Sequence, residues 1–470
     1  MIDALLMLVL MSVDATSIPP AEDVENYVAS STGAPNDTPW WLRFDDDELT
    51  TVIKIGLANN YDVRTAAARI VQAEAQTMRS LAPLLPSITA DGTVSIGPFE
   101  SLGFQFGGGL GGDGGGDTPS LFYNGSALLN ARWQLDIWGQ SYLAYRAASL
   151  QQDASSGDRE SVALALTVQV ATAYFDVVFN KEAIVLVEEQ IDANRRLLEL
   201  LELRFERGES SGLDVLQQKQ QLAARASELP PLRSQLRIAE QRLAILLGGP
   251  PRSTAPATVS SLPPLPPRPE LGQPVDLLDH RPDLRALAQR WEASSKQSSS
   301  ALRVHLPTLS VNGNAGWQFI RTIETDVQSV WGAGVTLSLP VFSGFDDVGR
   351  VSEARASESV ALETLNQGFL QAVNEVENAV VSEDETQAQL DLLKEQSEAA
   401  TAAQRESEAR YIAGLSNYID VLTALTAAQT ADRAVLQAER SLIAARLQLY
   451  ESLGGSWTRS ALANSDGGSR

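Results

Sequence analysis

The residues of this sequence best suited to do chemistry are carboxylates at matched points of an internal repeat. Residues 204–216 read RFERGESSGLDVL, and residues 410–422 read RYIAGLSNYIDVL. The match places Asp214 onto Asp420, an offset of 420 − 214 = 206 residues, and nearer the start of each copy 62–64 maps onto 283–285. A duplication of this length determines the architecture, so each local motif is interpreted within it.

Catalysis by paired carboxylates has no candidate pair. The chain has 59 acidic against 36 basic residues and a net charge of −23. A glycosidase, for example, needs two carboxylates at a fixed separation, and no pair here stands out from acids on solvated helix faces. Two histidines, His280 and His305, and no cysteine leave little for a general base or a metal site. We therefore predict no enzymatic activity, cofactor or metal. The acidic balance also argues against nucleic acid as a partner.

Each duplicated acid lies where a helix is predicted to begin. Ser211 precedes Asp214 by three residues, and Asn417 precedes Asp420 by three. This spacing is typical of a capping box, with a carboxylate near the positive end of the helix dipole. The same turns carry glycines, which tight turns accommodate easily; these are Gly208, Gly212 and Gly414.

Very long helices are predicted to position these turns. The tracts 140–207 and 346–412 contain no proline and could each span ~100 Å, and second helices are predicted over 213–247 and 418–453. In the first copy, apolar residues from Ile184 to Phe205 step by three and four, a coiled-coil seam interrupted once by Asn194. Small and polar residues at the matching positions of the second copy predict close packing or a water-facing side.

Four segments alternate between apolar and polar residues and predict two β-hairpins, 86–138 and 307–340. They have the length of transmembrane strands, and aromatic residues suit the membrane interfaces; these are Trp133, Trp138, Trp317 and Trp331. The alternative is a soluble sheet packed on helices. Four strands cannot close a barrel, so a membrane role requires a dimer with eight strands or a trimer with twelve.

The predicted fold is α+β and internally duplicated, with repeat 1 covering 48–250 and repeat 2 covering 275–456. We interpret 1–18, with its apolar run Ala4–Met11, as a degraded export signal or else a segment packed on the body. No stretch approaches the ~20 apolar residues of a membrane-spanning helix. The other expected segments are an extended one at 19–47, a proline-rich linker at 251–274 and a disordered tail at 457–470. The glycine-rich run 107–116 predicts a surface loop rather than a phosphate-binding or calcium-binding one.

Several short motifs, taken together with their order and their duplication, resemble the TolC/OprM family of outer-membrane efflux channels. Within that family they are most similar to the NodT-like subunits of RND-type efflux systems. The matching pieces are Trp40-Trp41, Phe44, Leu49, 60–64, Ala68-Arg69, Leu85-Pro86, 133–139, 228–230, 246–250, 281–284 and 339–344. The resemblance covers roughly 40–456. The family's lipid-attachment cysteine has no counterpart in this sequence.

The resemblance implies a homotrimer with a twelve-stranded barrel in the outer membrane of a Gram-negative bacterium and a twelve-helix tunnel in the periplasm. Its partners would be outer-membrane lipid, a periplasmic adaptor (membrane fusion) protein and an inner-membrane RND transporter. The duplicated turns would form the periplasmic tip that docks the adaptor, with Gly208, Gly212, Gly414 and Ser416 in those turns.

The resemblance also implies roles for residues at this tip. Asp420 would line the narrowest ring of the pore, next to an apolar ring at Ile419. Asp214 would bond Tyr411 and hold the tip shut. Ser416 replaces an arginine found in some members, and Thr423 replaces a second acid found in many, so the tip is expected to be held less tightly.

The predicted function is a passive exit duct for small molecules, namely drugs, toxic compounds or metal ions, in a tripartite efflux pump. Two alternatives stay open from the sequence. One is the outer-membrane channel of a type I protein secretion system, and the other is a periplasmic coiled-coil adaptor.

Overall fold

The computed structural model describes residues 38–98, 121–251, 258–321, 325–459 and 461–462. The predicted signal segment and the glycine-rich loop lie outside these residues. The chain divides into two compact units that do not follow the repeat boundaries, because each takes parts of both repeats. Unit 1 comprises 1–69, 154–288 and 363–470, and unit 2 comprises 70–153 and 289–362.

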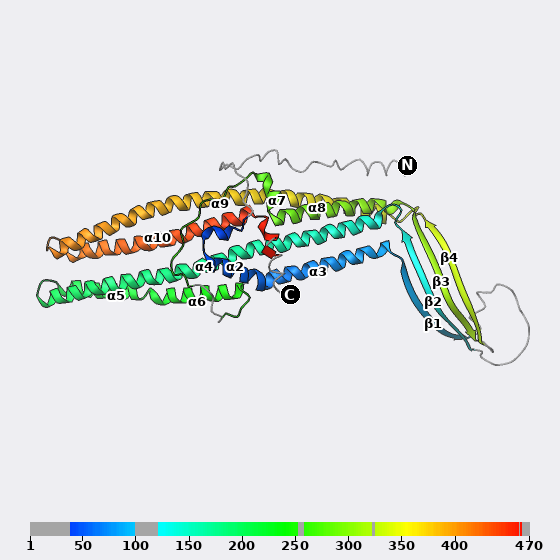
Figure 1. Cartoon of the computed structure of the whole chain (residues 1–470), viewed down its shortest axis with the longest axis horizontal. Helices are drawn as coiled ribbons and strands as arrows, with labels where there is room; N and C mark the ends of the chain where they lie inside the picture. The colour runs from blue at the N-terminus through cyan, green and yellow to red at the C-terminus, as the bar shows by residue number, and fades with distance from the viewer. Residues whose placement is uncertain (1–37, 99–120, 252–257, 322–324, 460, 463–470) are drawn as a thin grey trace, which may run out of the picture. The chain divides into compact units, whose positions relative to one another are not determined.

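Long helices dominate the fold, as predicted (Figure 1). The two longest are α4 (Gln140–Glu206) and α9 (Asp346–Ile412), which pass through both units. The other helices are η2 (Trp40–Phe44), α2 (Asp47–Asn59), α3 (Tyr61–Leu81), η3 (Ala82–Leu84), α5 (Gly212–Ala226), α6 (Leu229–Leu246), η5 (Pro274–Asp276), α7 (Leu277–His280), α8 (Pro282–Ala301), η6 (Leu302–His305) and α10 (Tyr418–Leu453).

The second helix of repeat 1 corrects the sequence prediction. It was expected to be continuous over 213–247, but α5 ends at Ala226 and α6 begins at Leu229. Pro230 and Pro231 follow directly, and a proline lacks the N–H that would bond the preceding turn. Proline is accepted in the first turn of a helix, so the chain restarts there. The matching α10 contains no proline and stays continuous.

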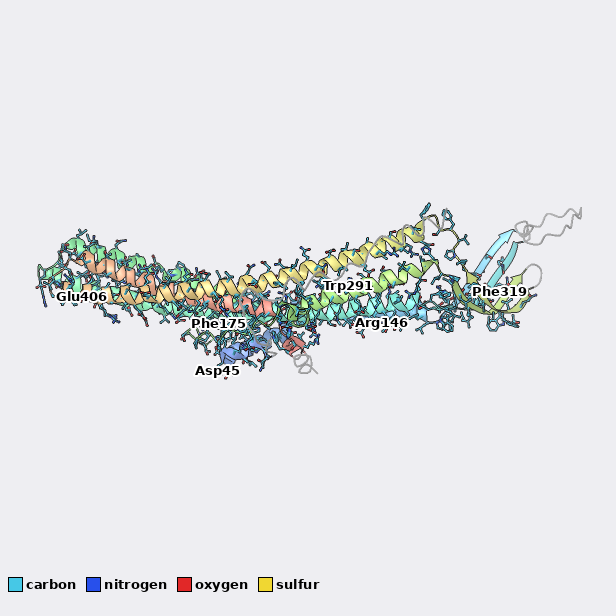
Figure 2. All side chains as sticks on the ribbon, turned by 90° about the horizontal axis from the view of Figure 1, so that it is seen from above. Asp45, Arg146, Phe175, Trp291, Phe319 and Glu406 are labelled. Carbon is cyan, nitrogen blue, oxygen red and sulfur yellow. The ribbon has the colours of Figure 1, made fainter. Side chains whose placement is uncertain are left out.

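The largest apolar core of unit 1 is built around the middle of α4. Tyr174 and Phe175 are almost completely buried there and belong to one apolar cluster with Leu49 and Ile53 of α2; Phe175 is labelled in Figure 2. This part of α4 is apolar and long enough to cross a membrane, contrary to expectation, but 67% of that stretch is buried within the chain. Its apolar character is therefore accounted for by the core.

Two aromatic residues next to this core are more ordered than predicted. Trp40, expected in an extended segment, belongs to η2 and stacks on Tyr450 with ring centroids 5.3 Å apart. Trp457, expected in a disordered tail, is buried and contacts Trp41 edge to face at 4.7 Å. Burying large aromatic surface stabilises both segments more than their local sequence indicates.

The proline-rich linker has no regular structure over 258–272, as its composition predicts. Side chains of the helices bind its backbone instead. Glu48 accepts hydrogen bonds from the N–H groups of Thr258 and Val259, and Arg446 donates to the carbonyl oxygen of Pro266. Arg446 is itself buried and paired with buried Glu383. The linker is thereby fixed to unit 1 although it lacks a helix or strand.

Unit 2 contains one antiparallel sheet in the order β1-β2-β3-β4, which confirms the four predicted strands (Figure 1). The strands are β1 (Ser87–Pro98), β2 (Leu121–Leu135), β3 (Thr308–Arg321) and β4 (Thr325–Ser338). The central pairing joins the two repeats, with Leu135 opposite Leu309. The outer edges of β1 and β4 have no partner strand among the described residues.

Apolar side chains of this sheet remain exposed in the single chain. Ile88, Val94, Trp331, Val335 and Leu337 are each more than 60% exposed. Two glycines are required by close packing between strands: a Cβ at Gly125 would clash with the Phe319 ring, and one at Gly316 with the Ala127 carbonyl oxygen. An apolar surface of this kind indicates a membrane or another chain as its environment.

Candidate functional site

The two duplicated turns of unit 1 have the same backbone structure. Gly208 and Gly414 have φ of 77° and 76°, the left-handed region that favours glycine. After each, the N–H of the next residue bonds a carbonyl five residues back, Glu209 to Arg204 and Leu415 to Arg410. This is the Schellman arrangement that ends a helix. Gly212 is different, since its φ is not positive and an added Cβ would only touch Phe205.

The duplicated acids cap the helices that follow, as predicted. The Asp214 carboxylate accepts from the backbone N–H of Ser211 at 3.1 Å and from the Ser210 hydroxyl at 3.1 Å. The Asp420 carboxylate accepts from the N–H of Asn417 at 3.2 Å. Asp420 is exposed, and neighbouring Ile419 is 50% exposed. Both side chains are thus available to a pore or to a second chain.

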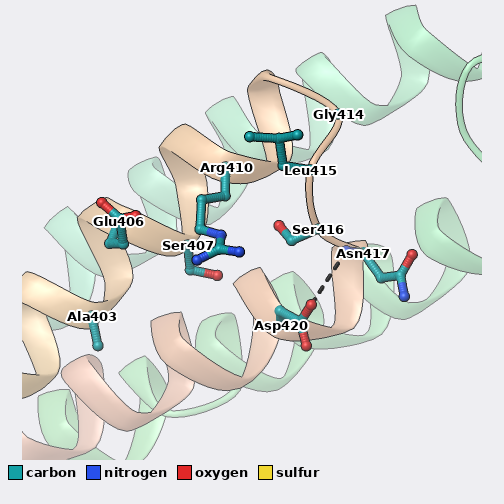
Figure 3. A pocket seen from close by; sticks show the side chains of 9 residues that line it. All are labelled: Ala403, Glu406, Ser407, Arg410, Gly414, Leu415, Ser416, Asn417 and Asp420. Carbon is teal, nitrogen blue, oxygen red and sulfur yellow. Dashed lines mark hydrogen bonds between the residues drawn. The ribbon is translucent and has the colours of Figure 1, made fainter.

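Asp420 lines an open groove of about 580 Å³ beside the second turn (Figure 3). Arg410, Ser407 and Glu406 of α9 line the same groove, and Ser416 lies between the two helices. The Ser416 hydroxyl is buried and has no hydrogen-bond partner among the described residues. The groove therefore presents carboxylate and guanidinium groups together at the turn.

The resemblance implied a hydrogen bond between Asp214 and Tyr411. No hydrogen bond joins these two side chains among the described residues, and one oxygen of the Asp214 carboxylate accepts from Ser210 and Ser211. The Tyr411 ring packs under the Arg204 guanidinium at 4.7 Å and beside the Tyr418 ring at 6.3 Å. Tyr411 belongs to a small apolar cluster with Leu201, Val215, Tyr418 and Val421. Packing, rather than a tyrosine–aspartate bond, holds Tyr411.

Sequence reasoning missed the buried polar contacts behind this cluster. Gln218 of α5, fully buried, donates to the Asn194 backbone oxygen at 2.7 Å and to its side-chain oxygen at 3.1 Å. The Tyr418 hydroxyl donates to Gln218 Oε1 at 2.6 Å. Asn194 was the available signal, since a polar residue in an apolar seam needs a buried partner.

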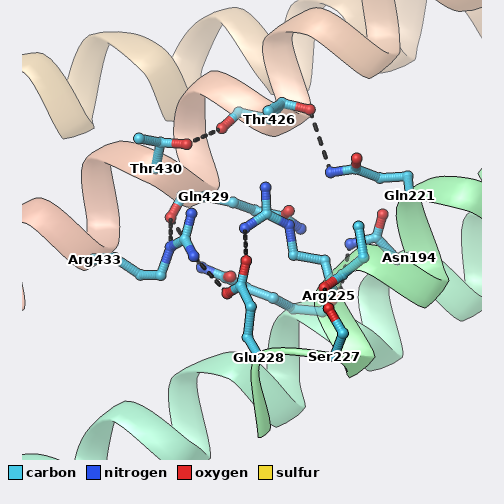
Figure 4. A network of polar contacts seen from close by, with 11 residues as sticks. Asn194, Gln221, Arg225, Ser227, Glu228, Thr426, Gln429, Thr430 and Arg433 are labelled. Carbon is cyan, nitrogen blue, oxygen red and sulfur yellow. Dashed lines mark hydrogen bonds and ion pairs between the residues drawn. The ribbon is translucent and has the colours of Figure 1, made fainter. Parts of the chain in front are cut away.

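A cluster of ion pairs joins α5 to α10, at a point on α10 further from the turn (Figure 4). Glu228, at the break between α5 and α6, contacts Arg225 at 2.9 Å and Arg433 of α10 at 2.5 Å. Burial, followed by the positive charge of Arg433, lowers the pKa of Arg225, and Glu228 opposes that shift. One carboxylate thus connects the helix break of repeat 1 to repeat 2.

The architecture defines a class of protein: duplicated long helices carry turns at their ends, and a four-stranded sheet has exposed apolar faces and unpaired edges. Such a sheet is stable in a membrane only when copies of it close into a barrel. The chain belongs to the outer membrane efflux protein family, whose model matches residues 52–249 and 274–455. The resemblance stated from the motifs is confirmed.

Relatives extend over nearly the whole chain. The pyoverdine export outer membrane protein OpmQ of Pseudomonas aeruginosa is 29% identical over 435 residues, covering 91% of this chain and 90% of that protein. Nodulation protein T of Rhizobium leguminosarum bv. trifolii is 25% identical over 413 residues, covering 86% of this chain and 85% of that protein. The solved outer-membrane channel OprN has a TM-score of 0.82 at 25% identity, covering 95% of this chain and 99% of that one.

A further solved structure, the outer membrane protein VceC of Vibrio cholerae, shares the fold with a TM-score of 0.77 at 23% identity, covering 90% of this chain and all of that one. Family, relatives and fold together establish an outer-membrane efflux channel of a tripartite pump. The predicted location in the outer membrane is confirmed. The family and the fold are those of channels rather than enzymes.

Proposed function

We propose that three copies of this chain form one channel, each contributing four strands to a closed barrel. The support is that the outer edges of β1 and β4 have no partner strand in the part of the chain that the structure describes, and such edges must find partners in lipid. Two copies would give eight strands, a barrel whose interior side chains fill. Three copies give twelve, which leaves an axial passage for cargo. This choice follows from the need for a conduit in an efflux protein.

The narrowest point of the proposed channel lies at Asp420 and Ile419. Three-fold symmetry would bring three exposed Asp420 carboxylates around one axis, each anchored by its bond to the N–H of Asn417. A ring of like charges attracts cations, as acidic rings of other pores do. The ring of Ile419 side chains beside it would add an apolar constriction. The channel itself makes and breaks no covalent bond.

The cargo of the proposed duct is small molecules, and its drive comes from partner proteins. The relatives are named for export of pyoverdine and for efflux of toluene and antibiotics, which supports small-molecule cargo over protein secretion. A periplasmic adaptor would dock at the duplicated turns, where Gly208, Gly212, Gly414 and Ser416 lie. It would link the channel to an inner-membrane RND transporter, and its binding would favour an open tip. The alternative of an adaptor protein does not account for the four-stranded sheet.

The test is the single-channel conductance of purified trimers in planar bilayers. Asp420→Ala is expected to raise the conductance of the closed channel, because it removes the side chain that narrows the pore. Asp420→Asn keeps an oxygen that accepts the Asn417 bond but loses the charge, so it should weaken cation selectivity. Asp62→Asn changes an exposed acid in the first turn of α3 and serves as the matched control. If Asp420→Ala conducts like wild type, the constriction lies elsewhere.

A further inference from the structure

One face of α10 carries a row of residues that bind the helices of repeat 1. Each contact joins residues more than 190 positions apart in sequence. Side chains pair Tyr418 with Gln218, Thr426 with Gln221, Arg433 with Glu228 and Arg440 with Asp176. The backbone carbonyl of Gln429 accepts from the Gln190 side chain. At 3.6 residues per turn these five positions lie within an arc of about 80°. They form a single stripe, here called the α10 stripe, that faces repeat 1.

The contacts of the α10 stripe differ in chemistry from one end to the other. Arg433 and Arg440 bind the carboxylates of Glu228 and Asp176, each at 2.5 Å, in charge-assisted bonds. Thr426 and Gln221 are 3.4 Å apart, a long neutral bond. Tyr418, at the turn end of α10, has one neutral hydrogen bond to Gln218. Neutral bonds are roughly half as strong as charge-assisted ones, so the strongest contacts of the stripe lie away from its turn end.

The Gln218 amide can take only one orientation between its neighbours. Its nitrogen lies 2.7 Å from the Asn194 backbone oxygen, which only accepts. The nitrogen must therefore point toward Asn194, and Oε1 must point toward Tyr418. The Tyr418 hydroxyl is thereby the donor. Burial, then the charges of Asp214 and Tyr411, raises the pKa of Tyr418 and keeps its hydroxyl protonated.

This chain of bonds acts directly on the segment that holds the proposed constriction. Tyr418 is the first residue of α10 and lies two residues before Asp420. Asn194, Gln218 and Tyr418 are 0%, 0% and 3% exposed, so water does not compete for their bonds. Loss of one partner would leave a buried polar group unpaired, which costs more than the bond itself contributes. The arrangement therefore fixes the start of α10 against α4 and α5.

We propose that the hydrogen-bond chain Tyr418–Gln218–Asn194 holds the channel tip closed, and that opening breaks this chain while the Arg433–Glu228 and Arg440–Asp176 pairs persist. The inference rests on the proposed function, because it takes the start of α10 as the gate. Tyr418 and Gln218 act as positioning residues for Asp420. The part of the α10 stripe from Arg433 to Arg440 then stays fixed against repeat 1. The start of α10, at Tyr418, moves relative to it.

The experiment compares three variants as reconstituted trimers in planar bilayers. Tyr418→Phe removes one oxygen and leaves Gln218 Oε1 unpaired, so the ratio of open to closed channels should rise about tenfold. Gln218→Met, of similar shape, should do the same. The double variant should lie closer to wild type than Gln218→Met alone, because Tyr418→Phe removes the hydroxyl that Gln218→Met leaves unpaired. Additive effects of the two changes would contradict a direct bond.

Matched controls separate this inference from folding defects. Tyr450→Phe makes the same change further along α10, where the buried hydroxyl has no partner among the described residues, and should conduct like wild type. Hydrogen exchange of detergent-solubilised trimers gives a second readout. Amides of 415–424 should exchange faster in Tyr418→Phe, while those of 436–450 stay unchanged. Equal exchange at both segments would overturn the inference.

The outcomes also separate this inference from the proposed gate. If Asp420→Ala raises conductance and Tyr418→Phe does not, the constriction at Asp420 is supported. The hydrogen-bond chain then contributes to folding but does not hold the tip closed. If Tyr418→Phe raises conductance and Asp420→Ala does not, the tip is held as inferred and the constriction is not at Asp420. A rise with Tyr411→Phe but not Tyr418→Phe would assign the closing contact to Tyr411 and refute the inference.

Discussion

At the residue scale, the same carboxylates serve folding and function. Asp214 and Asp420 both cap a helix, and Asp420 also lines an open groove with Arg410. Capping alone accounts for an acid at each turn. The functional argument for Asp420 therefore depends on its exposure and on the symmetry of an assembly, and the bilayer measurements above test it.

Two glutamates in unit 1 should affect stability with opposite dependence on pH. Burial, then the nearby Glu375, raises the pKa of Glu451 above its ordinary 4.5, against the opposing charge of Arg281. Such a group contributes stability below pH 4.5, and this is lost as pH rises through the folded-state pKa. Glu451→Gln should therefore raise the melting temperature at pH 7 and change it little near pH 4.

Glu48 provides the comparison with the opposite sign. The hydrogen bond from the Thr258 side chain, aided by backbone bonds from Thr258 and Val259, lowers the pKa of Glu48 and outweighs burial. Its contribution is present above pH 4.5 and is lost as pH falls through the folded-state pKa. Glu48→Gln should lower the melting temperature at pH 7. Calorimetry of both variants across pH 4 to 7 checks the pair, and parallel pH profiles would contradict it.

At the element scale, the duplicated turns explain why glycine recurs. Gly208 and Gly414 end α4 and α9 in the left-handed conformation, and nothing lies within 4 Å of an added Cβ at either. The requirement is therefore one of backbone conformation and not of space. Gly212, in the same turn, has no such requirement.

Gly414→Ala should destabilise the protein by about 1 kcal/mol, because alanine in the left-handed region is strained. Gly349→Ala is the matched control. Gly349 lies in α9, and an added Cβ there meets open space. Alanine should stabilise that helix by about 0.5–1 kcal/mol. Denaturant unfolding of both variants measures the two effects, and a loss of stability at both positions would disprove this reading of the turn.

At the scale of the whole molecule, the sheet is incomplete in one chain. Its central β2–β3 pairing joins the repeats, so one chain supplies a continuous four-stranded segment. Both outer edges of that segment lack a partner strand within the described ranges. Exposed apolar side chains such as Val94 and Val335 then find lipid or neighbours in an assembly. The duplication thus produces one barrel segment from two hairpins.

Disulfide trapping can count the copies in the barrel. The chain has no cysteine, so a pair introduced at the two edges reports only on those edges. Val94→Cys in β1 is combined in turn with a cysteine at each of positions 327–337 in β4. After oxidation, the pair that lies in register should give cross-linked species of two and three chains and none larger. A ladder ending at two chains would indicate an eight-stranded barrel. Absence of any cross-linked species throughout the scan would contradict closure by β1 and β4.

The amino-acid sequence by itself determined the features that depend on short-range chemistry. Period-two alternation predicted all four strands, and the serine–aspartate and asparagine–aspartate spacings predicted the starts of α5 and α10. These features follow from contacts within a few residues, which the local sequence specifies. The duplication extended each prediction from one half of the chain to the other. The family could be recognised from the sequence because its short motifs occur here in the family's order.

Only the tertiary structure decided which distant residues meet. At the start of α10, Tyr418 binds Gln218, which lies 200 positions away in the sequence. Trp457 became part of the core although its local sequence is polar. Such choices depend on how each helix is rotated and packed against others, and a rotation of one residue moves a side chain by about 100°. Local spacing does not encode that rotation, because it results from burying all the apolar faces together.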